Sequence, residues 1–251
     1  MWKQTFNEEV NSSIRELPKQ LQSNVLFSFF QKTSLGLGEE LSWISLFPSP
    51  AHSFLDCFPS LPQDRLFQLT KAHVMSLFIH YLDDQIIDET SDSVVNFSLI
   101  HFRTIVWQRL MNYVNGWKDW IGERGIQNFH SAASDYLASV ETKNHHFRTD
   151  LSFSEDLFLE QVAITIRLPF EVARQSMGQK DAEILWELMK GFGFAWRLFD
   201  DFFDEKDENF PDRDKYLLDE KGKIASRLPI PEQTSPLFSY YKDVLGFLKQ
   251  V

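Results

Sequence analysis

Two short runs of the chain place aspartates four residues apart inside strongly apolar sequence. The run FIHYLDDQIIDE contains Asp84 and Asp88, and the run GFAWRLFDDFFDE contains Asp200 and Asp204. On a helix, residues spaced i and i+4 project from one side, so each pair can bind a hard cation with two carboxylates. A buried carboxylate costs several kcal/mol unless it is paired or holds a metal. Because large apolar residues surround both pairs, we expect metal sites.

A single acidic patch is usually a solvated helix face. Two such patches on apolar helices, more than a hundred residues apart in sequence, are better explained by helices that face each other across one cavity and share metal ions. The predicted metal ligands are Asp83, Asp84, Asp88, Asp200, Asp201 and Asp204. Mg²⁺ keeps several waters and prefers phosphate oxygens, so this arrangement predicts a clamp for a diphosphate ester.

The elements that must position these aspartates are two long helices. The apolar periodicity predicts the first over residues 63–89, and the second begins near residue 180 and carries the aspartate stretch 191–208. A projection of the first helix gives one stripe that is expected to form a cavity wall, consisting of His73, Leu77, His80 or Tyr81, Asp84 and Asp88.

The remaining sequence also has helical patterns and weak strand signals. We expect covering helices over 1–32 with Pro18 as a break, a long connection over 34–62 and helices over about 95–116, 128–140, 154–177 and 237–249. Pro169 should kink or divide its helix. The charged tail around Lys215, Tyr216, Lys221 and Lys223 is expected to be a solvated loop, with a lid over the cavity as the alternative. The predicted fold is an all-α bundle around a deep central cavity, with residues 1–251 forming one domain.

DDQIID at 83–88 and GFAWRLFDDFFD at 193–204 resemble the two aspartate-rich motifs of the class I isoprenoid synthases. This family contains trans-prenyl diphosphate synthases, squalene and phytoene synthases and class I terpene synthases. The resemblance covers about residues 65–210 and rests on the pairing, order and separation of the motifs. It implies an all-helical isoprenoid synthase fold, up to three Mg²⁺ ions at the cavity mouth, a prenyl diphosphate substrate and a homodimer.

A bound diphosphate also needs protein cations, because Mg²⁺ alone leaves oxygens unpaired. The candidates are Arg167, Arg174, Lys143 and Arg197, with Arg167 favoured. The alternative for Arg167 is a salt bridge to Glu160 or Glu171, and the alternative for Arg197 is pairing with Asp200 or Asp201.

The substrate pocket is predicted to contain aromatic and apolar side chains next to the motifs. The candidates are Leu77, His80, Tyr81, Trp196 and Phe199. Aromatic faces could shield a carbocation from water, although aromatic residues at helical spacing are more often packing. His73 and His80 could act as bases, but a core histidine with a backbone partner is the favoured reading.

Two departures from the family bear on the reaction. The basic segment and the Arg pair that chain-elongating prenyl synthases use are absent, since ETSDSVVNFS follows Asp88 and no Arg lies between Asp88 and Arg103. We therefore predict a Mg²⁺-dependent terpene synthase in which Asp84, Asp88, Asp200 and Asp204 are the catalytic residues. The alternatives are a prenyltransferase that uses another acceptor and a non-catalytic helical interaction domain.

Composition limits the partners and the compartment. The formal charge of −11 without a Lys/Arg cluster disfavours nucleic-acid binding. No stretch reaches the ~20 apolar residues of a membrane span, and residues 1–20 lack the apolar core of a signal peptide. With a single cysteine, Cys57, the chain is expected to be cytoplasmic.

Overall fold

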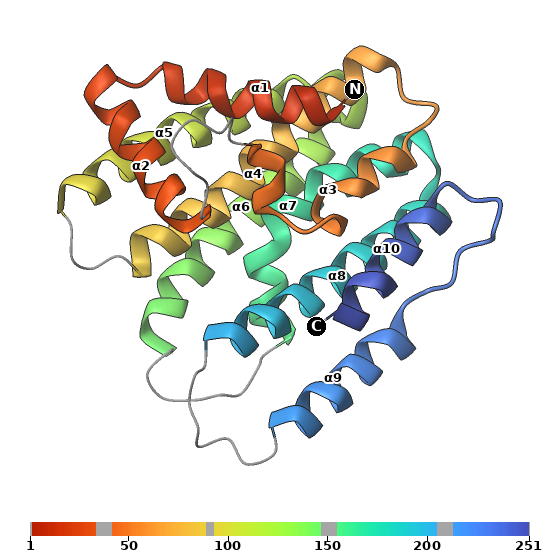
Figure 1. Cartoon of the computed structure of the whole chain (residues 1–251). Coiled ribbons are helices and arrows are strands. Elements are labelled where there is room, and N and C mark those ends of the chain that lie inside the picture. The colour runs from red at the N-terminus through yellow and green to blue at the C-terminus, as the bar shows by residue number, and fades with distance from the viewer. Residues whose placement is uncertain (1, 34–41, 89–92, 147–154, 205–212, 251) are drawn as a thin grey trace.

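The structure is a computed structural model in which residues 2–33, 42–88, 93–146, 155–204 and 213–250 are described. Side chains of residues 30–33, 87–88, 93–96, 141–146, 155–158, 161, 197–204 and 213–217 lie outside this description. The described residues are helical with no strand, which confirms the all-α prediction (Figure 1). The elements are α1 (Trp2–Arg15), α2 (Lys19–Thr33), η1 (Trp43–Leu46), α3 (Pro50–Ser53), η2 (Phe54–Cys57), α4 (Gln63–Asp88), α5 (Ser93–Asn115), α6 (Lys118–His146), α7 (Glu155–Ser176), α8 (Gln179–Asp204), α9 (Arg213–Arg227) and α10 (Leu237–Gln250).

Backbone chemistry explains several helix boundaries. Pro18 separates α1 from α2, as predicted, and its carbonyl accepts the amide of Leu21 at 2.9 Å in the first turn of α2. Gly178 connects α7 to α8 with φ of 88°, a left-handed conformation that costs a glycine little. These two short connections turn the chain back on itself, so successive helices pack against each other.

Three predicted elements need correction. The helix expected over 128–140 is the longer α6, which begins at Lys118 and contains a non-helical residue, Gly122, with φ of 70°. Of the two effects expected of Pro169, division of its helix is wrong, since α7 continues through it, and the kink stays a prediction. The expected solvated loop is wrong for residues 213–227, which form α9. The sequence KYLLDEKGKIAS is rich in helix formers, and Leu228 at the end of this segment is buried against α8 beside Gly191.

The interior is one connected set of buried apolar side chains that extends from Trp2 of α1 to Leu248 of α10. Aromatic rings form its centre, where Phe78 of α4 contacts Trp43 of η1 at 5.9 Å and Phe29 of α2 at 6.0 Å between ring centroids. Edge-to-face aromatic pairs of this kind add about 0.5–1.5 kcal/mol each beyond area burial. Many phenylalanines of the described residues therefore contribute to packing.

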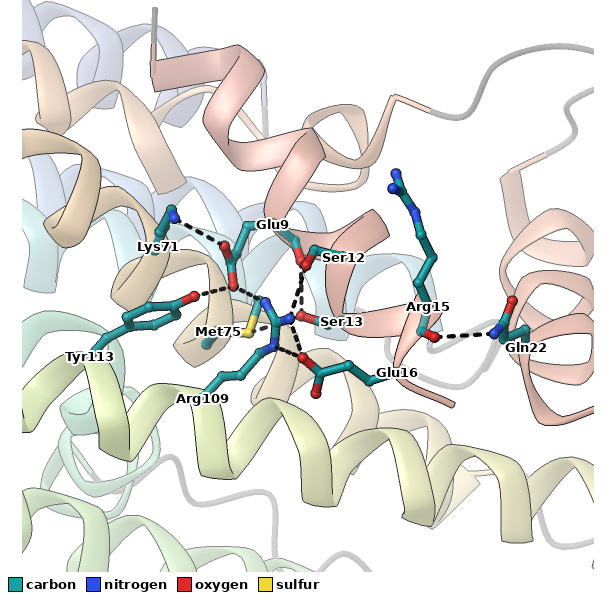
Figure 2. A network of polar contacts seen from close by, with 10 residues as sticks. All are labelled: Glu9, Ser12, Ser13, Arg15, Glu16, Gln22, Lys71, Met75, Arg109 and Tyr113. Atoms are coloured by element: carbon teal, nitrogen blue, oxygen red, sulfur yellow. Dashed lines mark hydrogen bonds and ion pairs between the residues drawn. The ribbon is translucent and has the colours of Figure 1, made fainter. Parts of the chain in front are cut away.

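A buried ionic network fastens α1 across α4 and α5 (Figure 2). Glu9, which is 4% exposed, accepts hydrogen bonds from Arg109 and Tyr113 of α5 and lies 3.7 Å from the ammonium of Lys71 of α4. Arg109 also donates to Ser12 of α1 at 2.9 Å. Sequence reasoning missed this network, although Glu9 falls in the apolar stripe of α1 between Phe6 and Ser13.

Two predictions from composition can be compared with the described residues. No helix among them combines the length and the hydropathy needed to span a bilayer. Cys57 is buried, its thiol donates to the carbonyl of Pro236 at 3.6 Å, and burial raises its pKa to about 12. Its thiolate is therefore scarce at neutral pH, as expected of a packing residue.

Candidate functional site

One aromatic ring joins the two helices that carry the aspartate motifs. Phe47, which follows η1, lies 6.3 Å from Tyr81 of α4 and 6.0 Å from Trp196 of α8 between ring centroids, both edge-on. Tyr81 precedes Asp84 by three residues, and Trp196 precedes Asp200 by four. Asp84 and Asp200 therefore each lie about one helical turn beyond a residue that contacts Phe47.

The direction of the two helices extends this proximity to the motifs. The C-terminal ends of α4 and α8 point to the same side of the molecule, at the lower left in Figure 1. At about 100° per residue, the position of Asp84 lies roughly 60° around α4 from Tyr81, and that of Asp200 roughly 40° around α8 from Trp196. Both acidic positions thus fall near the faces that meet at Phe47.

Several predicted site residues have side chains outside the described set. These are Asp88, Asp200, Asp201, Asp204, Phe199, Arg197 and Lys143. Their predicted metal, pocket and diphosphate roles stay predictions. Within the described residues, which include only Asp83 and Asp84 of the predicted metal ligands, no three His, Cys, Asp or Glu side chains converge as a metal site would require.

Asp83 has partners that sequence reasoning missed. Its carboxylate receives Arg103 of α5 at both oxygens, with Nη2 to Oδ2 at 3.1 Å, and the hydroxyl of Tyr136 of α6 donates to Oδ2 at 2.6 Å. The hydrogen bond to Asp83 raises the pKa of Arg103, and burial together with the negative charge of Asp83 raises the pKa of Tyr136. The ion pair with Arg103 attaches the end of α4 to α5, and the hydrogen bond from Tyr136 attaches it to α6.

The next residue is in a different environment. Asp84 is half-buried, whereas Asp83 is 6% exposed, and the negative charge of Asp84 also contributes to the raised pKa of Tyr136. Mg²⁺ is a hard cation that carboxylate oxygens bind. The donor type and partial accessibility of Asp84 fit this ion.

Arg167 and Arg174 form a separate ionic group with Glu171 on α7. The Nη1 atoms of Arg167 and Arg174 lie 4.0 Å and 3.1 Å from the carboxylate of Glu171, which also accepts from Asn128 of α6 at 2.8 Å. Arg167 covers the ring of Trp186 at 4.9 Å, and burial lowers its pKa. The salt bridge to Glu171 named as the alternative is therefore present.

The described contacts of Arg167 and Arg174 are with residues of α7 and α8. Thr165 lies on the side of α7 next to His73 of α4, where its carbonyl influences the imidazole. Arg167 and Arg174 are two and nine residues further on, which places them about 200° and 180° around the helix from Thr165. Their diphosphate-binding role stays a prediction, and the described contacts do not bring them to Asp84.

The predicted pocket residues divide between two surroundings. Tyr81 stacks on Phe29 at 5.3 Å and meets Phe47, so it shares the aromatic contact with Trp196. His80 instead packs edge-on against Tyr136 at 4.7 Å, and Leu77 is buried. The structure therefore brings Tyr81 and Trp196 together and directs His80 toward α6.

His73 is a core histidine, as favoured from the sequence. Its Nε2 donates to the carbonyl of Ala51 at 2.6 Å, which requires the tautomer protonated at Nε2. Burial lowers its pKa to about 4, against the opposing effect of the carbonyls of Ala51 and Thr165. The neutral ring is fixed between α4 and the segment before it.

A half-open cavity of about 490 Å³ lies beside the aromatic contact. Phe47 and Trp196 line it, and residues of α10 form the opposite wall. No sequence pattern predicted this cavity, because its walls come from segments about 50, 196 and 246 residues along the chain. The predicted central cavity between α4 and α8 stays a prediction.

Comparison with known proteins identifies no relative: no family model, no curated protein and no solved structure matches this chain.

Proposed function

We propose that this chain is a Mg²⁺-dependent class I terpene synthase that ionises a linear prenyl diphosphate and cyclises or deprotonates the resulting carbocation. The observation that carries the proposal is the contact of Phe47 with both Tyr81 and Trp196. It supports an arrangement in which the acidic ends of α4 and α8 flank one space. The aspartate spacing in both helices supplies the chemistry of that space.

The residues that would hold Mg²⁺ are Asp84 and Asp88 on α4 and Asp200, Asp201 and Asp204 on α8. When bound with a diphosphate, Mg²⁺ neutralises charge on the leaving group. The C–O bond of the ester breaks, the diphosphate leaves with the electron pair and the allylic carbon becomes cationic. The cation then loses a proton or forms a new C–C bond.

Aromatic side chains next to the motifs would protect the cation. Phe47, Tyr81 and Trp196 offer π faces that attract positive charge and exclude water that would otherwise add to the cation. Lys143 near the end of α6 and Arg197 in α8 are the proposed cations for the diphosphate. The ends of α6 and α8 point to the same side as the end of α4 (Figure 1), which favours these two residues over Arg167 and Arg174.

The test is incubation of the purified chain with Mg²⁺ and geranyl, farnesyl or geranylgeranyl diphosphate, with and without isopentenyl diphosphate, followed by mass analysis of organic extracts. We expect a hydrocarbon or terpene alcohol from one diphosphate alone. Asp84→Asn and Asp200→Asn should each lower turnover at least a hundredfold. Glu232→Gln is the matched control, because Glu232 is an exposed carboxylate in the turn before α10, and it should leave turnover unchanged.

Other results would replace the proposal. Elongated diphosphates that require isopentenyl diphosphate would identify a chain-elongating synthase. No product, together with a rise in melting temperature on adding Mg²⁺ and diphosphate, would indicate a prenyltransferase that lacks its acceptor. No product and no thermal response would favour the interaction domain.

A further inference from the structure

The half-open cavity of about 490 Å³ is lined by aromatic and polar side chains. Phe47, Trp196 and Phe247 line it, and Phe47 and Phe247 are less than 9% exposed. Ser49 and Asp243 also line it, and the hydroxyl of Ser49 donates to the carboxylate of Asp243 at 3.1 Å, which ties the segment before α3 to α10. Small-molecule sites likewise combine apolar walls with polar groups.

A glycine opens the α10 wall of this cavity. Gly246 lines the cavity, and a Cβ added to it would meet no atom within 4 Å. Glycine weakens a helix interior relative to alanine, so its presence in α10 is not explained by local helix stability. The missing side chain leaves volume next to Phe247 that any larger residue would fill.

The size and charge of the cavity indicate its occupant. Small-molecule clefts measure roughly 300–1,000 Å³, and this volume of about 490 Å³ lies within that range. Lys242 and Asp243 line it together, so the lining is close to neutral and does not favour an anionic group. Because three aromatic rings line it, an uncharged hydrocarbon chain suits the cavity best.

The position of the cavity connects it to the acidic helix ends. Phe47 and Trp196 belong both to the cavity lining and to the contact that joins α4 to α8. Trp196 is four residues, or about one helical turn, before Asp200. A chain whose diphosphate lies at the ends of α4 and α8 would therefore pass Trp196 to enter the cavity.

We propose that this cavity, beside α8 and against α10, receives the far end of the hydrocarbon chain of a prenyl substrate, and that Gly246 sets the longest chain it accepts. The inference rests on the proposed function for the identity of the substrate. It adds a binding site and a specificity-determining residue on a helix that carries neither aspartate motif.

The experiment measures binding of farnesol and geranylgeraniol by calorimetry, because these neutral alcohols carry the chain without the diphosphate. The proteins are wild type, Gly246→Leu, Gly246→Trp and the control Gly222→Trp. Gly222 of α9 is also a helical glycine at which a Cβ would meet nothing within 4 Å. Melting temperatures establish that each variant folds.

We expect Gly246→Trp to weaken geranylgeraniol binding at least tenfold and farnesol binding less, with Gly246→Leu intermediate and Gly222→Trp equal to wild type. Unchanged binding in folded Gly246→Leu or Gly246→Trp would overturn the proposal, and so would a wild type that binds neither alcohol. The two proposals can fail separately. If alcohol binding depends on Gly246 but no prenyl diphosphate is turned over, the proposed function is wrong and the cavity proposal stands. If a prenyl diphosphate is turned over but the Gly246 variants keep the chain preference of the wild type, the cavity proposal is wrong and the proposed function stands.

Discussion

The guanidinium of Arg103 and the carboxylate of Asp83 form a two-point ion pair between α4 and α5, 20 residues apart in sequence. Asp83 is 8% exposed at its side chain and Arg103 is 26% exposed. Asp84, the next residue, is half-buried. Two adjacent aspartates of one motif thus have different surroundings, and we expect them to have different roles.

Asparagine substitutions should separate these roles. Asp83→Asn leaves the partly buried Arg103 without a countercharge and should lower the free energy of unfolding by about 2 kcal/mol. Asp84→Asn should change it by less than about 1 kcal/mol while lowering turnover. Urea unfolding at an unchanged m-value measures the first effect, and product formation measures the second.

Tyr136→Phe provides the control for this comparison, because it removes one hydrogen bond to Asp83 and keeps the ion pair. It should cost about 1 kcal/mol. A stable Asp83→Asn variant that has lost turnover would instead assign Asp83 to the metal site, as the sequence predicted.

Two glycine-to-alanine substitutions should have opposite effects on stability. At Gly246 the added Cβ meets nothing within 4 Å, so the better helix propensity of alanine should stabilise the protein by about 0.5–1 kcal/mol. At Gly191 of α8 the Cβ would collide with the side chain of Leu228, which is 7% exposed. Overpacking of this kind costs about 1–3 kcal/mol and should outweigh the gain in propensity.

A double variant tests the mechanism at Gly191. Leu228→Ala makes room for the added methyl group, so Gly191→Ala should be less harmful in that background than in the wild type. Thermal melts of the four proteins in the cycle measure the coupling. Additive effects would mean that the contact between Gly191 of α8 and Leu228 is not the cause.

The sequence predicted the elements well where the signal was local. The bounds of α4 and α10, the break at Pro18 and the core role of His73 follow from periodicity, proline chemistry and the ordinary behaviour of buried histidines. The partners of Asp83 could not be predicted, because Arg103 and Tyr136 are 20 and 53 residues away and meet it only after α4, α5 and α6 pack.

The prediction for α7 was likewise limited to contacts within one helix. The i, i+4 spacing of Arg167 and Glu171 correctly suggested a salt bridge. The face of α7 that turns toward α4 depends on how three helices pack. Sequence alone therefore left open which side chains surround Arg167, and in the structure its guanidinium lies 4.9 Å from the ring centroid of Trp186 of α8.

Stability should fall as the pH is lowered from about 6.5 to about 4. Burial lowers the pKa of His73 and of His52 to about 4 in the folded protein, whereas an unfolded histidine has a pKa of about 6.5. Between these values the unfolded state binds more protons, so acid favours unfolding. Each lowered pKa contributes at most roughly 3 kcal/mol to the free energy of unfolding, and this contribution is fully present above pH 6.5.

Replacement of His73 should reduce this dependence. His73→Gln keeps a donor for the carbonyl of Ala51 but does not titrate, so the melting temperature of the variant should vary less between pH 6.5 and 4 than that of the wild type. His101→Gln is the control, because His101 is exposed. Equal pH dependence in wild type and His73→Gln would contradict the assignment.

The network around Glu9 predicts that two carboxylates on one arginine differ in their effect on stability. Arg109 contacts Glu9, which is 4% exposed, and Glu16, which is 51% exposed. Glu9→Ala leaves Arg109 and the Tyr113 hydroxyl without their buried acceptor and should cost about 3–5 kcal/mol. Glu16→Ala breaks an exposed pair and should cost less than about 1 kcal/mol.

The salt dependence of stability should also distinguish the contribution of Glu9 from that of Glu16. Added salt screens exposed charges more than buried ones, so the cost of Glu16→Ala should shrink at high ionic strength while that of Glu9→Ala persists. Urea unfolding of both variants at low and high salt measures this. Because Glu9 joins α1 to α4 and α5, its loss should also speed amide hydrogen exchange in α1 more than in α7. Uniform exchange throughout the chain would instead mean that α1 unfolds only together with the whole core.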